Sequence, residues 1–209
     1  STNGIAYLDL MFDLKNLAPD KVPYLGLLKS VLGYVDTAHY TYGELSNEIN
    51  AETGGIACGV EVFDRADSVD EYRAFFGVKG KVMYPKMDVI FRMIREILNT
   101  SDVTDTRRLH EIISRVKSRA QSSLVSAGHS TAVLRAASYA SPMAAFQDGM
   151  AGIAYYQFIE KLDREFDDRK EEIIENLKSL MVEILRPENL CISYTGERES
   201  LDSVQKQIR

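Results

Sequence analysis

The chain has 209 residues, 45% of them hydrophobic and 27% charged, which is the composition of an ordinary soluble globular protein with a sizeable core. Its 25 basic and 31 acidic residues give a net charge of −6. This balance excludes nucleic acid and anionic membranes as main partners, because both require a concentrated basic face. No apolar run approaches the ~20 residues of a membrane span, and the chain opens on polar residues 1–3. We therefore expect neither a membrane-spanning helix nor a secretory leader.

The two cysteines, Cys58 and Cys191, lie far apart and form no CxxC pattern. Each belongs to a segment with the pattern of a strand, residues 56–60 and 189–194. We expect two buried, reduced thiols rather than a disulfide or a metal pair. A reducing compartment follows from that expectation.

The first half of the chain predicts three strands and two helices. The helix over 41–53 begins with a capping box formed by Thr41 and Glu44, and we expect Gly54-Gly55 to end it with a positive φ. The turn-like segment 64–68 predicts a hairpin. The expected strands are 4–14, 56–63 and 71–84, and the expected helices are 24–35 and 41–53.

The second half predicts mainly helices. Pro85 is placed at the first turn of a helix, Gly128 interrupts a helix, and Pro187 stops one. We expect Pro142 to open a short segment, a helix from Gly149 onward, and a restart of that helix at a second capping box over 168–171. The expected helices are 85–98, 106–126, 149–162 and 168–184, followed by a strand over 189–194 and a last helix from 195.

This order of elements predicts an α+β fold. Strands come first, helices occupy the middle, and one strand closes the chain, which indicates helices packed on one face of a mostly antiparallel sheet. We see no linker, and we expect residues 1–209 to form a single domain.

One segment approaches a zinc-peptidase motif. Residues 110–114 read HEIIS and match HExxH up to the last position, where Ser114 replaces the second histidine. A zinc site needs both imidazoles one turn apart on one helix face, and a hydroxyl is a poor substitute. We therefore interpret His110 and Glu111 as part of a polar helix face.

No other pattern indicates catalysis or cofactor binding. His39 and His129 lie in predicted turns, where histidines are usually solvated or bonded to backbone. No serine lies in a G-x-S-x-G elbow and no phosphate-binding loop is present. The charged run 161–172 indicates a solvated helix face, and Met83, Met87 and Met93 fit core positions. The sequence thus predicts no catalytic residue and no metal ligand, and it assigns no substrate-binding residue.

Several segments, taken in order, resemble the presequence-protease branch of the pitrilysin/insulinase zinc peptidases. They are TNGIAY at 2–7, FDL at 12–14, YGEL at 42–45, TGGI at 53–56 and RPENLCI at 186–192. Their order and spacing are similar to the third of that family's homologous domains, and the resemblance covers nearly the whole chain. It implies the metallohydrolase-like α+β fold of the pitrilysin and processing peptidases.

The resemblance also implies a division of labour. In that family the domains close around a peptide, and zinc is bound in the first domain by a helix with His-x-x-Glu-His. The matching helix here reads YLGLLK at 24–29, so it offers neither zinc ligands nor a glutamate to activate water. The resemblance implies a non-catalytic chamber wall in a zinc endopeptidase located in a bacterial cytoplasm or an organelle matrix. Its partners would be the other domains and unfolded peptides, and a net acidic wall would suit basic peptides.

Two alternatives stay open at this point. The chain could be a stand-alone, inactive scaffold or binding protein of the same fold. It could also be an enzyme whose site is completed across a homodimer. A much longer gene with His-x-x-Glu-His near its start would distinguish the first alternative from a peptidase fragment.

Overall fold

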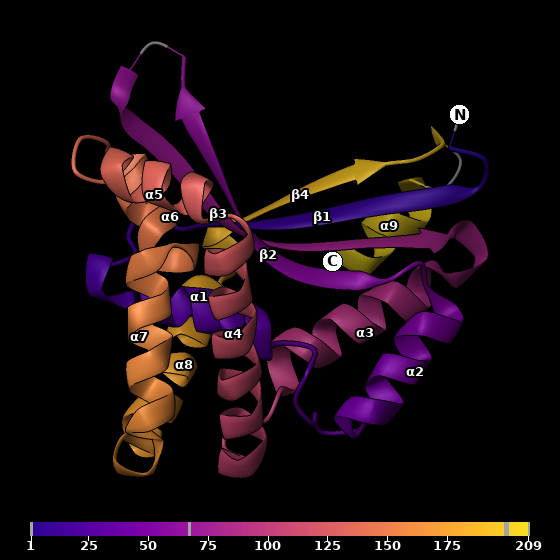
Figure 1. Ribbon diagram of the computed structural model, residues 1–209. Helices are drawn as coiled ribbons and strands as arrows, with labels where there is room; N and C mark the ends of the chain where they lie inside the picture. The colour runs from indigo at the N-terminus through magenta and orange to yellow at the C-terminus, as the bar shows by residue number, and fades with distance from the viewer. Residues whose placement is uncertain (1, 67, 199–200, 209) are drawn as a thin grey trace.

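The computed structural model describes residues 2–66, 68–198 and 201–208 (Figure 1). The strands are β1 (Ile5–Asp13), β2 (Ile56–Arg65), β3 (Ser68–Met83) and β4 (Leu190–Thr195). The helices are α1 (Val22–Val31), α2 (Tyr42–Glu52), α3 (Met87–Thr100), α4 (Thr106–Ser126), α5 (Gly128–Ala137), α6 (Pro142–Ala151), α7 (Ile153–Arg164), α8 (Phe166–Ile184) and α9 (Leu201–Ile208). Short 3-10 turns precede α1, α3 and β4 at Pro19–Lys21, Tyr84–Lys86 and Pro187–Asn189.

The strands form one antiparallel sheet in the order β2-β3-β1-β4. The predicted hairpin is present, since β2 pairs with β3 along almost its full length. The two inner strands, β3 and β1, pair from Ile5↔Met83 to Asp13↔Phe75. Strand β4, near the end of the chain, pairs with the other side of β1.

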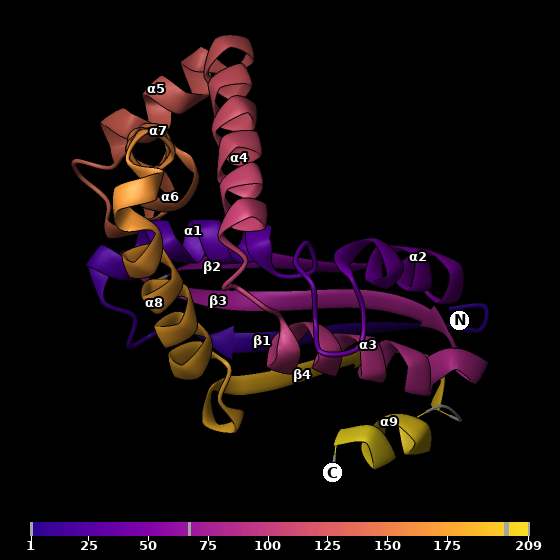
Figure 2. The same ribbon diagram turned by 90° about the horizontal axis from the view of Figure 1, so that it is seen from below.

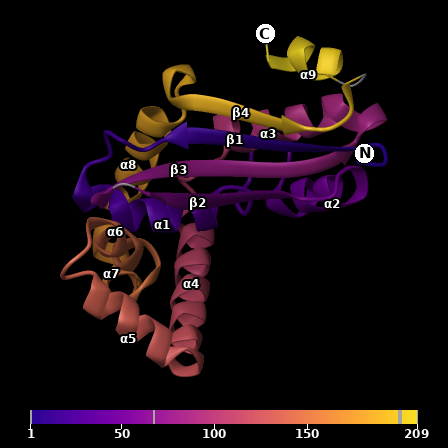
Figure 3. The ribbon, with the colours of Figure 1, turned by 90° about the horizontal axis from the view of Figure 1, so that it is seen from above.

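Helices cover one face of this sheet and leave the other open (Figures 2 and 3). Side chains alternate along β1, so that Ala6, Leu8, Leu10 and Phe12 are buried under the helices and the residues between them are not. Helix α1 supplies the opposite wall of the core, where Leu25, Leu27 and Leu28 are fully buried. The predicted α+β fold with helices on one face of an antiparallel sheet is confirmed.

Helices α4 to α8 form an extension that projects from the sheet (Figure 1). Helices α4 and α7 contact each other, and α6 contacts both α1 and α7. The outer part of the extension has little buried surface, because α5 has no buried residue and Val125, at the end of α4, is 84% exposed. Within the described ranges, no helix combines the length and the apolar character needed to cross a membrane.

Local signals placed several boundaries correctly. The Thr41–Glu44 capping box is present in both directions at the start of α2, and α4 spans the predicted residues 106–126. Gly55 has a φ of +109°, whereas the α2 helix already ends at Glu52 and Gly54 has no positive φ. The glycine conformation therefore turns the chain into β2 rather than capping the helix.

Two predicted helix boundaries are wrong. The break between α6 and α7 lies at Gly152, and Gly149 is inside α6. Asp148 explains the shift, because its buried carboxylate accepts the backbone N–H of Ile153 at 2.9 Å and so begins the next helix. Helix α8 starts at Phe166 without a side-chain cap, so Asp168 lies in its first turn instead of capping it.

Two predictions of burial are wrong, those for Cys191 and Met83. Cys191 is exposed on the edge strand β4, whereas Cys58, on the opposite edge strand β2, packs partly buried against the core. Both cysteines are free, as predicted. Met83 is 62% exposed because it points to the open face of the sheet, whereas Met87 and Met93 are buried as predicted.

The charged run 161–172 is more than a solvated face, because Glu172 links α8 to α1. The Tyr24 hydroxyl donates to Glu172 at 2.7 Å, and the Arg169 guanidinium donates to both carboxylate oxygens at 2.9 and 2.6 Å. The hydrogen bonds from Arg169, and then the one from Tyr24, lower the pKa of Glu172 to about 2.

This depressed pKa predicts an acid-sensitive contribution to stability. The Glu172 contribution is present above the carboxyl's pKa of 4.5 in the unfolded chain and is lost as the pH falls toward about 2. Because 48% of the side chain is exposed, we expect at most about 1 kcal/mol. Urea unfolding should show Glu172→Gln less stable than the parent at pH 6 and nearly equal at pH 2.5. Glu171→Gln, on the same turn and without an ion pair to any described residue, should show no such convergence.

Candidate functional site

The described residues do not fit a zinc ion. Helix α1 is the helix that the resemblance matches to the family's zinc helix, and its Leu25, Leu27 and Leu28 are fully buried in the core. Within the part of the chain that the structure describes, no group of three or more His, Cys, Asp or Glu side chains could hold a metal.

The HEIIS segment lies on α4 and holds that helix against α7. Ser114 and Lys117 both donate to Asp163 of α7. His110 lies 3.4 Å from the same carboxylate, and its ring stacks on Phe166 with centroids 4.3 Å apart. These contacts use the polar side of α4 for packing between helices.

The remaining histidines lie apart from each other and from His110. The His39 ring and backbone N–H both contact Glu96, at 3.1 and 2.9 Å, and this fixes the loop before α2 against α3. The sequence did not predict this partner, because Glu96 lies on a helix more than fifty residues further along the chain. His129 is exposed at the start of α5.

The face of the sheet that the helices leave uncovered is the main candidate for a functional surface. The register places alternate residues of all strands on it, beginning with Tyr7 opposite Thr195 and Asp9 opposite Ser193. The neighbouring strands add Lys79 and Ala57, which are also opposite each other. We call this surface the open face; its residues are Ile5, Tyr7, Asp9, Met11, Asp13, Ala57, Gly59, Glu61, Phe63, Arg73, Phe75, Gly77, Lys79, Lys81, Met83, Cys191, Ser193 and Thr195.

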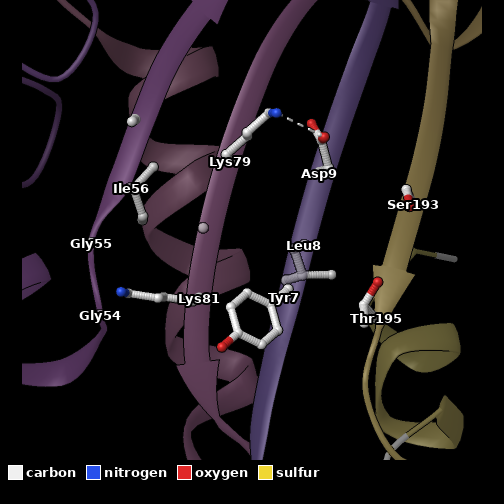
Figure 4. Close-up of a pocket in the computed structure, with 12 residues that line it drawn as sticks. Tyr7, Leu8, Asp9, Gly54, Gly55, Ile56, Lys79, Lys81, Ser193 and Thr195 are labelled. Atoms are coloured by element: carbon white, nitrogen blue, oxygen red, sulfur yellow. Dashed lines mark ion pairs between the residues drawn. The ribbon is translucent and has the colours of Figure 1, made fainter. Parts of the chain in front are cut away.

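A cavity of about 440 Å³ lies on the open face, at the end where β2 begins (Figure 4). Its lining combines the phenol of Tyr7, the hydroxyls of Ser193 and Thr195, and the side chains of Lys79 and Lys81. Tyr7 and Lys81 are register partners on adjacent strands, and Figure 4 shows the Lys81 side chain directed toward Gly54 and away from the Tyr7 ring. The cavity thus presents hydroxyl and ammonium groups along an exposed sheet.

The charges of the open face are mixed. Lys79 Nζ lies 3.5 Å from Asp9 Oδ2 and also binds Glu61, and Arg73 pairs with Asp13 at 2.6 Å. The hydrogen bond to Glu61 raises the pKa of Lys79 above its usual value. The expectation of an acidic wall does not describe this face, because cations and carboxylates alternate across it.

The residues that line this cavity can form hydrogen bonds and ion pairs with a ligand. No histidine lines the cavity, so none of its hydroxyls has an imidazole base beside it. A row of hydroxyl, ammonium and carboxylate groups can hydrogen-bond the backbone and polar side chains of an extended peptide. Sequence reasoning missed this face, although the alternation of Tyr7, Asp9 and Met11 with buried residues was a signal for it.

A solved structure with a similar fold covers nearly the whole chain. The inactive peptidase domain of a candidate zinc protease from Bordetella parapertussis aligns with a TM-score of 0.56, covering 92% of this chain and 93% of that one at 14% identity. At this identity the comparison establishes the fold alone.

Comparisons of the sequence show the family to which the chain belongs. The chain belongs to the family described as Peptidase M-16C associated, whose model matches residues 1–162. It is 30% identical over its full length to the protein HypA of Clostridium perfringens, and 28% identical over 86% of its length to the mitochondrial presequence protease of Yarrowia lipolytica. The chain spans 21% and 18% of these relatives. The resemblance to the presequence-protease branch is confirmed.

Proposed function

We propose that this chain is a single non-catalytic domain of a longer zinc endopeptidase, in which it forms part of the wall of a peptide-degrading chamber. The observation that supports this proposal best is the open face, a sheet surface that carries a cavity and that none of the described helices covers. An extended peptide presents backbone N–H and C=O groups and side chains of both charges, and the mixed charges of the open face can pair with them.

The zinc chemistry would belong to another domain of the same longer chain. This division of roles explains two facts together. A relative is described as a presequence protease, and the described residues of this chain do not fit a zinc ion. The same relative is described as mitochondrial, which supports an organelle matrix or, for a bacterial source, the cytoplasm.

The helical extension supports contacts with neighbouring domains. Val125, Val133 and Tyr139 are 84%, 68% and 78% exposed at its outer end. These residues lie at the end of α4, on α5 and just after α5, and large apolar side chains exposed on neighbouring elements are typical of a contact surface. We propose that the extension packs on other domains of the longer chain while the open face meets the peptide.

Photo-crosslinking in the intact enzyme tests the wall role. A benzoylphenylalanine in place of Tyr7, on the open face, should capture a labelled unfolded peptide on irradiation. The same photo-crosslinker in place of Tyr139, equally aromatic and more exposed but at the outer end of the extension, should capture little or none. Equal capture at both positions, or capture at neither, contradicts the wall role.

A cleavage assay tests the non-catalytic part of the proposal. The 209-residue chain, supplied with zinc and a quenched fluorescent peptide, should show no cleavage above the buffer blank. Cleavage that a chelator abolishes would overturn this part of the proposal and favour a site completed within a homodimer.

A further inference from the structure

A second cavity, of about 560 Å³, lies under the edge of β2 between α1, α2 and α4. Consecutive residues of β2, from Ile56 to Val60, line it. Neighbouring residues of a strand point to opposite faces, so a cavity that touches all of them borders the edge of the strand. In the order β2-β3-β1-β4, that edge pairs with no other described strand.

Three cations line this cavity, and none of its lining residues is acidic. Lys29 comes from α1, and Arg115 and Arg119 come from successive turns of α4. In a chain with a net charge of −6, three cations gathered without a carboxylate indicate a site for a negative ligand. Ser46 and Asn50 of α2 add hydrogen-bonding groups to the same wall.

Lys29 is the most informative of the three cations, because it is half-buried and has no counter-ion among the described residues. Among the described residues, no side chain forms an ion pair or a hydrogen bond with its ammonium group, and burial lowers its pKa. A half-buried ammonium without a partner is unfavourable, and an anion beside it would remove that cost. The position therefore favours a ligand that brings a negative charge.

The two arginines are free to complete the site. Arg115 and Arg119 are exposed and form no ion pair with any described residue. The Arg115 guanidinium lies 5.1 Å from the centre of the Tyr34 ring, which also lines the cavity. Stacking on an aromatic ring holds a guanidinium in place and leaves its N–H groups available to an oxyanion.

We propose that this cavity binds an oxyanion, a carboxylate or phosphate group, between Lys29, Arg115 and Arg119. The group could belong to a free small anion or to an acidic peptide segment lying along the edge of β2. Both present the same oxygens to the three cations, and arginine and lysine bind either group. The proposal does not depend on the wall role of the open face.

Calorimetric titration of the 209-residue chain at low ionic strength tests the proposal. The probes are inorganic phosphate, citrate, a blocked tetraglutamate peptide and its tetraglutamine counterpart. We expect at least one anionic probe to bind and tetraglutamine not to bind. Tighter binding of tetraglutamate than of phosphate or citrate identifies a peptide segment as the ligand, and the reverse order identifies a free anion.

Variants locate the binding. Lys29→Gln, and separately the double variant Arg115→Gln with Arg119→Gln, should each weaken binding about tenfold or more, as loss of a charge-assisted hydrogen bond does. Arg107→Gln, a 90%-exposed arginine on the same helix outside the cavity, should bind like the parent. The arginine variants are at the surface and should unfold at the parent's temperature.

Two results would overturn the proposal. The first is that no anionic probe binds. The second is that the Lys29 and arginine variants bind as tightly as the parent, or that Arg107→Gln weakens binding as much as they do, because the attraction would then be a general effect of surface charge.

Discussion

Replacement of Phe76 by alanine is expected to lower the free energy of unfolding by about 3–5 kcal/mol, as is typical for a large buried aromatic side chain. Phe76 lies in the middle of β3 and has 0% exposure. Its register partners on the two neighbouring strands are Phe12 and Val60, so the substitution opens a cavity beneath the centre of the sheet. Urea or thermal unfolding measures the effect.

A second phenylalanine of the same hairpin provides the control. Phe63 on β2 is 50% exposed on the open face, so Phe63→Ala should cost less than about 1 kcal/mol. If Phe76→Ala does not fold, Phe76→Leu keeps most of the volume and should cost about 1–2 kcal/mol. Equal losses for Phe63→Ala and Phe76→Ala would show that the helices do not cover the face assigned to the core.

Replacement of Gly26 by alanine is expected to destabilise the protein by about 2 kcal/mol, although alanine is the better helix former. A Cβ atom at Gly26 would lie 2.7 Å from the backbone oxygen of Met150 and 2.6 Å from Tyr155 Cε2. The first of these atoms belongs to the backbone of α6 and cannot rotate away, so α1 and α6 would have to separate.

Gly43 is the matched control for this substitution. It also lies in a helix, the first turn of α2, and a Cβ atom there would meet nothing within 4 Å. Gly43→Ala should therefore leave the stability unchanged or raise it by up to about 1 kcal/mol. Chemical denaturation of both variants separates helix propensity from close packing, and equal stability changes would contradict the tight contact between α1 and α6.

Much of the fold could be predicted because its signals are local. The Thr41–Glu44 capping box, the hairpin pattern and the helical apolar periodicity each depend on a few neighbouring residues. Where prediction failed, a distant or tertiary contact decided the structure. Asp148 is one example. Its buried carboxylate pairs with Arg135 at 2.7 Å and accepts the backbone N–H of Ile153, so α7 begins after Gly152 rather than at Gly149, as the sequence had suggested.

The candidate sites were harder to predict than the fold. The resemblance correctly indicated the family, yet the open face depends on which side of the alternating strands the helices cover. Met83 and Cys191 were assigned to the core for this reason. The proposed oxyanion-binding cavity depends on still more distant residues, because α1 and α4 bring Lys29 and Arg115 together only after folding. A sequence pattern within one helix does not show which residues of another helix will lie beside it in the folded protein.

The position of β1 has a consequence for how the chain folds during synthesis. This first strand lies inside the sheet, between β3 and β4, so residues from opposite ends of the chain are direct neighbours, as Tyr7 and Thr195 are. The β2–β3 hairpin can form from local sequence as soon as it leaves the ribosome. The other edge of β1, by contrast, stays unpaired until β4 (Leu190–Thr195) has been synthesised. Closure of such long-range pairs slows folding, so completion of this sheet is expected to be the late step.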